Sequence, residues 1–430
     1  MKNILIITAF VLFTGLGLSA QQTPAPKQVG KITLKGGTAH IGNGKVIKNS
    51  VITIEEGKIT GVYDSASAPT DTEGKMIDVS GQHVYPGFIA PDTTLGLVEI
   101  SAVRATNDDD EIGEYNPNVE AIVAYNAESK VVESMRPNGV LLAQTVPQGG
   151  RISGLSSVVQ LDAWNWEDAV VKRSDGIHLN WPNSFTRGRW WLDEDPGYKP
   201  NEDYAEDVNE IKDFIRQSKA YNAGGSDIRN LPYEAMNTFL KDSSNLYVHV
   251  NGEKEILDVL QFKNDMNLDK VVLVGAYRGY KVADQIAKAN VPVILARVHE
   301  LPKSEDDDYD ISYKMAKILD DAGVLVALGN SGEFWQARNI PFYAGQLTAE
   351  GLDFEEALKL ITQNPAKILG ISDVMGTLEA GKDATLFVSK GNALEMSGNN
   401  LTKAMIQGRD ISLETHQTEL WKRYMEKYSR

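Results

Sequence analysis

Short β-branched segments punctuated by glycine occur near both ends of this 430-residue chain, and they flank a long region with a different pattern. Near the amino end, residues 31–34, 51–54 and 58–62 each suit a strand, and the Gly-containing pairs between them suit tight turns with positive φ. Near the carboxyl end, residues 384–389 and 401–406 are candidate strands. The sequence therefore predicts a β unit at each end of the chain.

The central region alternates candidate strands with candidate helices, which is the pattern of a parallel β/α barrel. The candidate strands are residues 139–146, 156–161, 176–181, 246–250, 270–274, 291–295 and 324–328. The candidate helices are residues 253–263, 280–288, 311–321 and 354–360. A chain of this length with 42% hydrophobic residues can build a barrel and one smaller domain.

The first 20 residues have the features of a secretory signal peptide: a charge at Lys2, an apolar stretch over residues 4–18 and a small-residue cleavage site ending at Ala20. A membrane anchor is the alternative, but the apolar run is short for a span. We therefore predict a signal peptide over residues 1–20, a flexible leader over residues 21–30 and no membrane insertion after cleavage. The chain has no cysteine and therefore no disulfides, so we expect an exported protein of this kind to be located in a bacterial periplasm.

Composition excludes several classes of function. A formal net charge of −16 argues against a nucleic-acid partner, and the absence of cysteine removes thiolate metal ligands and a cysteine nucleophile. The sequence has no G-x-S-x-G nucleophile motif and no phosphate-binding glycine loop. The acidic run at residues 304–308 lacks the spacing of a calcium loop and suits a solvated surface.

A family resemblance begins at the segment from Val84 to Leu97, an apolar run interrupted by Pro-Gly that leads into polar residues. It resembles the first barrel strand of the amidohydrolase superfamily, in the imidazolonepropionase-like branch, which reads P-G-hydrophobic-I-D-x-H-x-H-L-G. Residues 376–384 resemble the family's G-x-L-E-x-G-K-D-A segment, and residues 362–366 resemble its T-x-N-P-A turn. The residues that match in the first segment are Pro86, Gly87, Ile89, Leu95 and Gly96.

The resemblance implies an α/β protein with a (β/α)8 TIM-like barrel over residues 83–375. It also implies a small β-sandwich built from residues 31–82 and 376–412, followed by a C-terminal helix over residues 413–430. Members of this family hydrolyse C–N and related bonds with one or two divalent metals at the C-terminal ends of the barrel strands.

At the family's ligand positions the residues differ from the usual ones. Asp92 and Thr94 stand where strand one has its two histidines, and only the first can ligate a hard cation well. His249 stands at the ligand position of strand five. Gly275 replaces the histidine of strand six, and Ser331 replaces the aspartate base of strand eight. These are the candidate site positions, and any residual metal site would use His249 and Asp92.

Two further features allow two interpretations each. His178 lies in the apolar fourth strand, where a hydrogen-bonded core histidine is favoured over a metal ligand. Residues 164–204 hold five of the seven tryptophans, which suit packing against the barrel more than stacking on a sugar or peptide. Residues 101–125 form a second long, acidic excursion from a minimal barrel.

The sequence leaves three functional hypotheses. The favoured one is an exported non-metal pseudo-hydrolase that acts as a binding or partner subunit, in a homo- or hetero-oligomer with an amidohydrolase relative. The second is an active hydrolase of peptide or cyclic amide bonds that keeps one metal, which would be zinc. The third is a protein that binds a small molecule or peptide through the Trp-rich segment. Under the favoured hypothesis no cofactor is expected.

Overall fold

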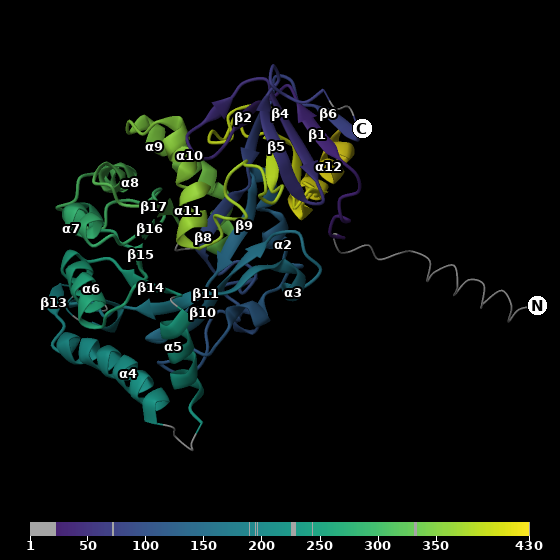
Figure 1. Ribbon diagram of the computed structural model, residues 1–430. Helices are drawn as coiled ribbons and strands as arrows, with labels where there is room; N and C mark the ends of the chain where they lie inside the picture. Colours follow the sequence, from purple (N-terminus) through teal and green to yellow (C-terminus); the bar gives the residue numbers. More distant parts are fainter. Residues whose placement is uncertain are drawn as a thin grey trace, which may run out of the picture.

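The computed structural model describes residues 23–70, 73–188, 190–193, 195, 197–224, 229–242, 244–330 and 333–429. The predicted signal peptide and Ser331 lie outside these residues. A β-sandwich lies at one end of the molecule, and a barrel with its helices occupies the rest (Figure 1). Within the described part of the chain, no helix is long and apolar enough to cross a membrane.

The sandwich consists of two sheets. The first contains strands from the amino end only, and the second contains strands from both ends of the chain. The first has the order β5-β4-β1-β6, with β1 Ile32–Lys35, β4 Ser50–Glu55, β5 Lys58–Asp64 and β6 Lys75–Asp78. The second has the order β20-β19-β18-β7-β2-β3, with β2 Thr38–His40, β3 Val46–Ile47, β7 His83–Pro86, β18 Leu386–Ser389, β19 Leu401–Ile406 and β20 Arg409–Asp410. Ile52, Leu386 and Met405 are fully buried in one core cluster, so the two chain ends form a single packed unit.

One domain boundary and the character of the leader differ from the expectation. His83–Pro86 pairs with β18 and β2 in the sandwich, so the chain enters the barrel only after Gly87 and not at residue 83. The end of the leader is also fixed rather than flexible, because Pro24 is buried and the Ala25 N–H donates to Asp162 at 2.9 Å.

The barrel sheet has eight strands in the order β17-β16-β15-β14-β11-β10-β9-β8. Their bounds are β8 Phe88–Thr93, β9 Val140–Thr145, β10 Ile152–Gln160, β11 Val170–Asn180, β14 Asn245–Val250, β15 Val271–Gly275, β16 Val293–Leu295 and β17 Val326–Leu328. The sheet is nearly closed by the segment after α10, because Leu360 accepts from the Leu328 N–H and Ile361 accepts from the Ile89 N–H. This segment therefore joins the two edge strands.

One strand departs from the expected parallel arrangement. β10 pairs antiparallel with both β9 and β11, whereas the other neighbouring pairs in the barrel sheet are parallel. A parallel pair needs a crossover of a dozen or more residues, and the connections over residues 146–151 and 161–169 are too short for one. The region from residue 139 to residue 181 therefore forms a meander instead of two β/α units.

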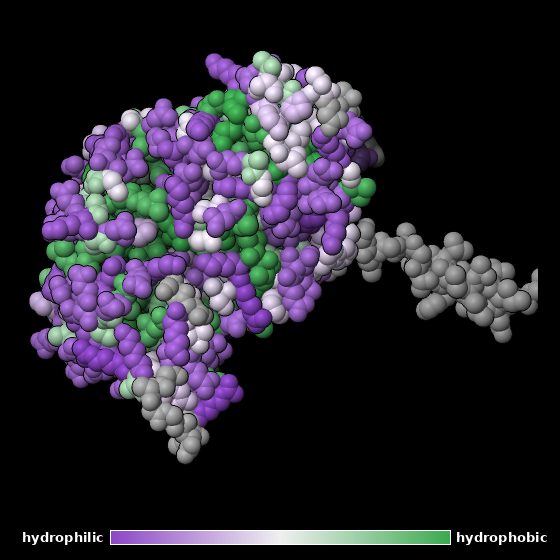
Figure 2. Space-filling model, viewed as in Figure 1, coloured by the Kyte–Doolittle hydropathy of each residue, from purple (hydrophilic) through white to green (hydrophobic). Residues whose placement is uncertain are grey.

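The helices occupy the outside of the barrel and the connections (Figure 1). The α-helices are α2 Lys130–Glu133, α3 Trp166–Ala169, α4 Tyr204–Gly224, α5 Leu231–Asp242, α6 Glu253–Asp265, α7 Ala283–Lys288, α8 Ile311–Asp321, α9 Ile340–Ala349, α10 Phe354–Lys359, α11 Gln363–Ile368 and α12 His416–Tyr428. The 3-10 helices are η1 Arg104–Thr106, η2 Ala121–Ala124, η3 Arg136–Asn138, η4 Trp190–Leu192, η5 Gly279–Val282 and η6 Phe334–Asn339, and a hairpin joins β12 Phe185–Arg187 to β13 Tyr198–Pro200. On the face shown in Figure 2, hydrophilic residues cover most of the described surface, and apolar residues gather between the helices.

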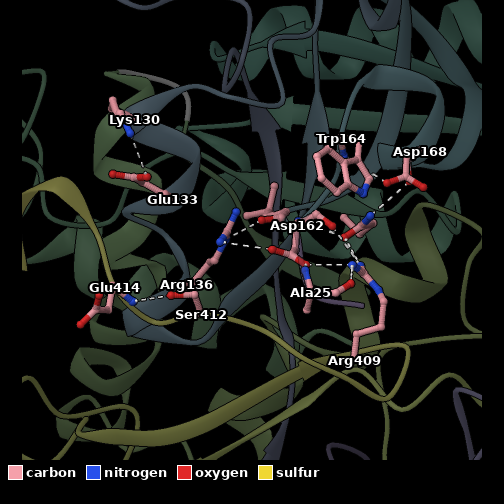
Figure 3. A network of polar contacts seen from close by, with 12 residues as sticks. Ala25, Lys130, Glu133, Arg136, Asp162, Trp164, Asp168, Arg409, Ser412 and Glu414 are labelled. Atoms are coloured by element: carbon pink, nitrogen blue, oxygen red, sulfur yellow. Dashed lines mark hydrogen bonds and ion pairs between the residues drawn. The ribbon is translucent and has the colours of Figure 1, made fainter. Parts of the chain in front are cut away.

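A buried ionic cluster connects the sandwich to the barrel (Figure 3). Asp162, just after β10, lies between two guanidinium groups, with its Oδ2 2.8 Å from Arg409 Nη1 and its Oδ1 3.3 Å from Arg136 Nη1. Arg409 belongs to sandwich strand β20, and Arg136 precedes barrel strand β9. Burial lowers the pKa of Arg136, and the adjacent Asp162 opposes that shift. One carboxylate thus links the sandwich, the barrel and the amino-terminal segment.

Candidate metal centre

Asp92 lies near the end of β8, where the backbone turns sharply. Its φ is +52°, a left-handed conformation that is uncommon for a residue other than glycine. Its N–H donates to Gln144 Oε1 at 3.0 Å, which holds the turn in place. The side chain is 3% exposed, and its Oδ2 has no hydrogen-bond partner in the described part of the chain. A buried carboxylate oxygen of this kind is suited to bind an ion or a hydrogen-bond donor of a ligand.

Two histidines from neighbouring parallel strands meet this carboxylate. His178 in β11 and His249 in β14 have their Nδ1 and Nε2 atoms 2.8 Å apart. One ligand atom each from Asp92, His178 and His249 lies within 4.8 Å of the others. His178 is completely buried, and no described residue forms a hydrogen bond with its Nε2. The three side chains therefore converge at the C-terminal end of the barrel strands, where barrel enzymes place their sites.

His178 is the buried, hydrogen-bonded histidine that its apolar strand predicts, and it also places a second imidazole beside His249, which the expectation of a site built from His249 and Asp92 alone did not include. In the parallel ladder Asn180 pairs with His249, which brings His178 beside it. This ladder is regular over residues 176–180 and 245–249, so His178 and His249 lie on the same face of the sheet, but the register of two strands that are far apart in the chain is not visible in the sequence. Sequence alternation alone could not predict this facing.

Electrostatics favour the neutral form of both imidazoles. Burial lowers the pKa of His178 well below its ordinary value, and the neighbouring His249 lowers it further. Burial also lowers the pKa of His249, while the Asp92 carboxylate partly opposes that shift. Neutral imidazole is the form that ligates a metal. Two such imidazoles and one carboxylate give the three protein ligands of a typical catalytic zinc site, so the residues fit one ion.

A buried polar network inside the barrel supports these ligands. Gln144, which accepts from the Asp92 N–H, donates through Nε2 to Asp175 Oδ2 at 2.7 Å. The Tyr247 hydroxyl donates to the same oxygen at 2.6 Å, and its ring stacks on His178 with centroids 4.6 Å apart. Burial raises the pKa of Asp175, and Lys172 Nζ, 3.1 Å from Asp175 Oδ1, opposes this. The network thus fixes both Asp92 and His178.

The ligand group opens into a polar pocket of about 380 Å³, which we call the mouth pocket. It is lined by Asp92, Thr93, Thr94, Val98, Ser101, Asn107, Asp109, Gln148, His249, Asn330, Glu333 and Phe334. Thr94 and Asp92 therefore share the pocket with His249, as expected. Gly275 ends β15 beside Val250 and does not line the pocket.

The acidic excursion after strand one covers this pocket. We call its part from Ser101 to Asp109 the lid segment. Its segment around Asp109 is held by two backbone hydrogen bonds, from the Asp108 N–H to Leu97 at 2.8 Å and from the Gln148 N–H to Asp109 at 2.6 Å. Burial raises the pKa of Asp109, and the adjacent Asp110 contributes in the same direction. Sequence reasoning had assigned no role to Asp109, Asn330 or Gln144, because only the folded lid and the barrel interior bring them to the ligands.

A larger groove of about 1360 Å³ lies beside the hairpin β12–β13. Of the Trp-rich segment, Trp181 is 5% exposed and lines this groove, and Trp166 packs on the core. Trp164 and Trp191 are 63% and 65% exposed. The tryptophans are therefore divided between packing and the surface, so neither interpretation of the segment holds for all of them.

Solved structures with the same architecture identify the fold. An amidohydrolase from Thermotoga maritima superposes with a TM-score of 0.77 at 21% identity, covering 89% of this chain and 99% of that one. The chain has the amidohydrolase-superfamily fold. A sequence model of the amidohydrolase family matches residues 245–411, which include His249 and the C-terminal sandwich strands β18, β19 and β20.

Other amidohydrolase-fold structures are more distant. A molinate hydrolase gives a TM-score of 0.52 at 14% identity, covering 91% of this chain and 95% of that one. A Xaa-Pro dipeptidase with bound methionine in its active site gives 0.52 at 15% identity, covering 89% of this chain and 100% of that one. A search of curated proteins finds no significant match. At these identities the likeness concerns the fold, and the imidazolonepropionase-like branch stays a prediction.

Proposed function

We propose that this amidohydrolase-fold protein is a hydrolase of C–N bonds that works with a single divalent metal. The observation that carries the proposal is the convergence of Asp92, His178 and His249, with ligand atoms within 4.8 Å of one another and two buried polar atoms without partners. A metal held there lowers the pKa of bound water and polarises a substrate carbonyl.

The chain itself must supply a proton acceptor. The family's aspartate position corresponds to Ser331, and the preceding Asn330 cannot serve as a base. Asp109 lines the same pocket, and burial raises the pKa of its carboxyl toward the range in which a general base works well. We assign the proton-accepting role to Asp109, which the lid segment presents to the pocket. This carboxylate follows the first barrel strand, whereas the family's aspartate follows the eighth.

A pseudo-hydrolase remains the second candidate, because one specific observation favours it. Asn330, two residues after β17, and Ser331 at the family's aspartate position are both uncharged, whereas the usual chemistry needs a carboxylate there. In that case the pocket would bind a ligand, and the protein would act as a partner subunit of an active relative.

The two candidates differ in turnover by the metal-loaded protein. The test incubates the zinc-loaded mature protein with a panel of dipeptides and cyclic amides and follows product amines. Asp109→Asn should lower kcat/KM by about 100-fold or more, the usual contribution of a general base, while Asp108→Asn on the exposed neighbouring position should not. Protein that holds one equivalent of zinc and turns over none of the panel would instead favour the pseudo-hydrolase.

Export to the periplasm belongs to the same proposal. It is supported by Lys2, the apolar residues 4–18 and the small residues before the cleavage site. The amino-terminal sequence of the protein recovered from a bacterial periplasmic fraction tests this, and we expect it to begin at Gln21.

A further inference from the structure

We propose that the mouth pocket recognises a cationic amine, such as the free ammonium group of an amino-acid amide or a peptide. This inference rests on the proposed function where it names the substrate class, but binding of the amine can be measured without catalysis. It concerns the part of the pocket beyond the metal ligands, formed by Asn330, Glu333 and the lid segment at Ser101 and Asp109.

The charge of the pocket is the first argument. Three carboxylates line it, those of Asp92, Asp109 and Glu333, and among its described lining residues there is no lysine or arginine. With all three ionised the formal charge is −3, and one divalent cation at the ligand group leaves −1. A pocket with excess negative charge attracts a cation and disfavours an anionic ligand group.

The second argument is an acceptor without a donor. Asn330 is 1% exposed and lines the pocket, and its Nδ2 donates to the Glu333 carbonyl at 3.1 Å. That bond fixes the amide, and its Oδ1 has no hydrogen-bond partner among the residues that the structure describes. A buried amide oxygen without a donor costs free energy, which an N–H group of a ligand would recover. An ammonium group has three donors and can satisfy Asn330 and a carboxylate together.

The position of Glu333 completes the site. Ser101 Oγ on the lid donates to Glu333 Oε2 at 3.5 Å, so the lid and the loop after β17 meet at this carboxylate. The amine would therefore lie between the lid and β17, while the carbonyl of the same molecule faces the ligand group on β8, β11 and β14. This arrangement would select amides that carry a free amine near the reacting carbonyl.

The experiment is isothermal titration calorimetry at pH 7 with two matched probes, L-leucinamide and N-acetyl-L-leucinamide, which differ in the positive charge. Leucinamide should bind saturably, the acetylated compound at least tenfold more weakly, and added NaCl should weaken the first more than the second. Glu333→Gln should weaken leucinamide binding only about three- to tenfold, because Glu333 is exposed and solvent screens its charge. Glu305→Gln, on an exposed loop outside the pocket, is the control and should change nothing.

Equal affinity for both probes, no binding of either, or unchanged affinity in Glu333→Gln would overturn the inference. Zinc titration of the same samples separates it from the proposed function. Leucinamide binding without zinc binding would support the amine site and contradict the metal hydrolase. Zinc binding without leucinamide binding would support the metal site and contradict the amine site.

Discussion

Replacing Asp162 by asparagine removes the charge that links the sandwich to the barrel. The side chains of Asp162, Arg136 and Arg409 are 2%, 6% and 11% exposed, so water cannot replace the lost carboxylate. Removing one partner of a buried ion pair typically costs about 3–5 kcal/mol. Both guanidinium groups keep other acceptors, Leu161 O for Arg136 and Gln160 Oε1 for Arg409, and these favour the lower end of that range. We therefore expect a loss of about 3 kcal/mol in the free energy of unfolding.

The assay is urea unfolding followed by both far-UV circular dichroism and tryptophan fluorescence, since two probes reveal whether the sandwich and barrel unfold together. Asp373→Asn, an exposed carboxylate far along the chain, is the matched control and should stay within about 0.5 kcal/mol of the parent protein. In a double-mutant cycle, Asp162→Asn and Arg409→Gln should be strongly non-additive. A loss below about 1 kcal/mol for Asp162→Asn, or additive effects in the cycle, would refute the assigned role of this cluster.

Three further predictions follow from the supporting contacts. Gln144→Leu removes the acceptor for the Asp92 N–H and should lower zinc affinity about 10- to 100-fold by calorimetry while the fold is retained; unchanged affinity would remove Gln144 from the support of the site. Burial lowers the pKa of His83 below its ordinary 6.5, and the nearby His40 contributes a smaller effect in the same direction. His83 therefore binds more protons in the unfolded chain than in the folded one. Stability should therefore be complete above about pH 6.5 and fall as the pH drops below it, and His83→Asn should flatten this slope in urea titrations. Gly96→Ala should cost about 1–3 kcal/mol in unfolding free energy, because φ is +80° and the new Cβ would lie 2.3 Å from the Tyr125 ring; a thermal melt identical to that of the parent would contradict this.

Much of the fold could be predicted from the pattern of the chain. The predicted helix over residues 311–321 has the same bounds in the structure, and the strands at residues 246–250 and 401–406 differ by at most one residue. The two helices α4 and α5 were not predicted; α4 in particular is rich in charged and polar residues, so its apolar period is weak. The strand predicted at residues 156–161 corresponds to β10, but its antiparallel direction was not predicted, since a short connection has to be recognised before the strand directions can be assigned.

The candidate site was predicted in part. Asp92 and His249 were predicted because the ends of their strands resemble the ligand positions of the amidohydrolase family. In the structure their ligand atoms lie within 4.8 Å of each other. His178 was assigned to the core because one histidine in an apolar strand gives no sign of what it faces, and here its neighbour is set by the β11–β14 register. Asp109 and Asn330 come from a lid and a strand end that are far apart in sequence, so only the fold shows that they share a pocket.

Zinc titration of the metal-free mature protein tests the central claim most directly. If Asp92, His178 and His249 form a metal site, calorimetry should show one equivalent of zinc bound, and His178→Ala should lose at least 100-fold in affinity. His416→Ala removes an exposed imidazole in α12 and should bind zinc as the parent does. Absence of saturable zinc binding in the parent protein, or full retention of binding in His178→Ala, would contradict the account.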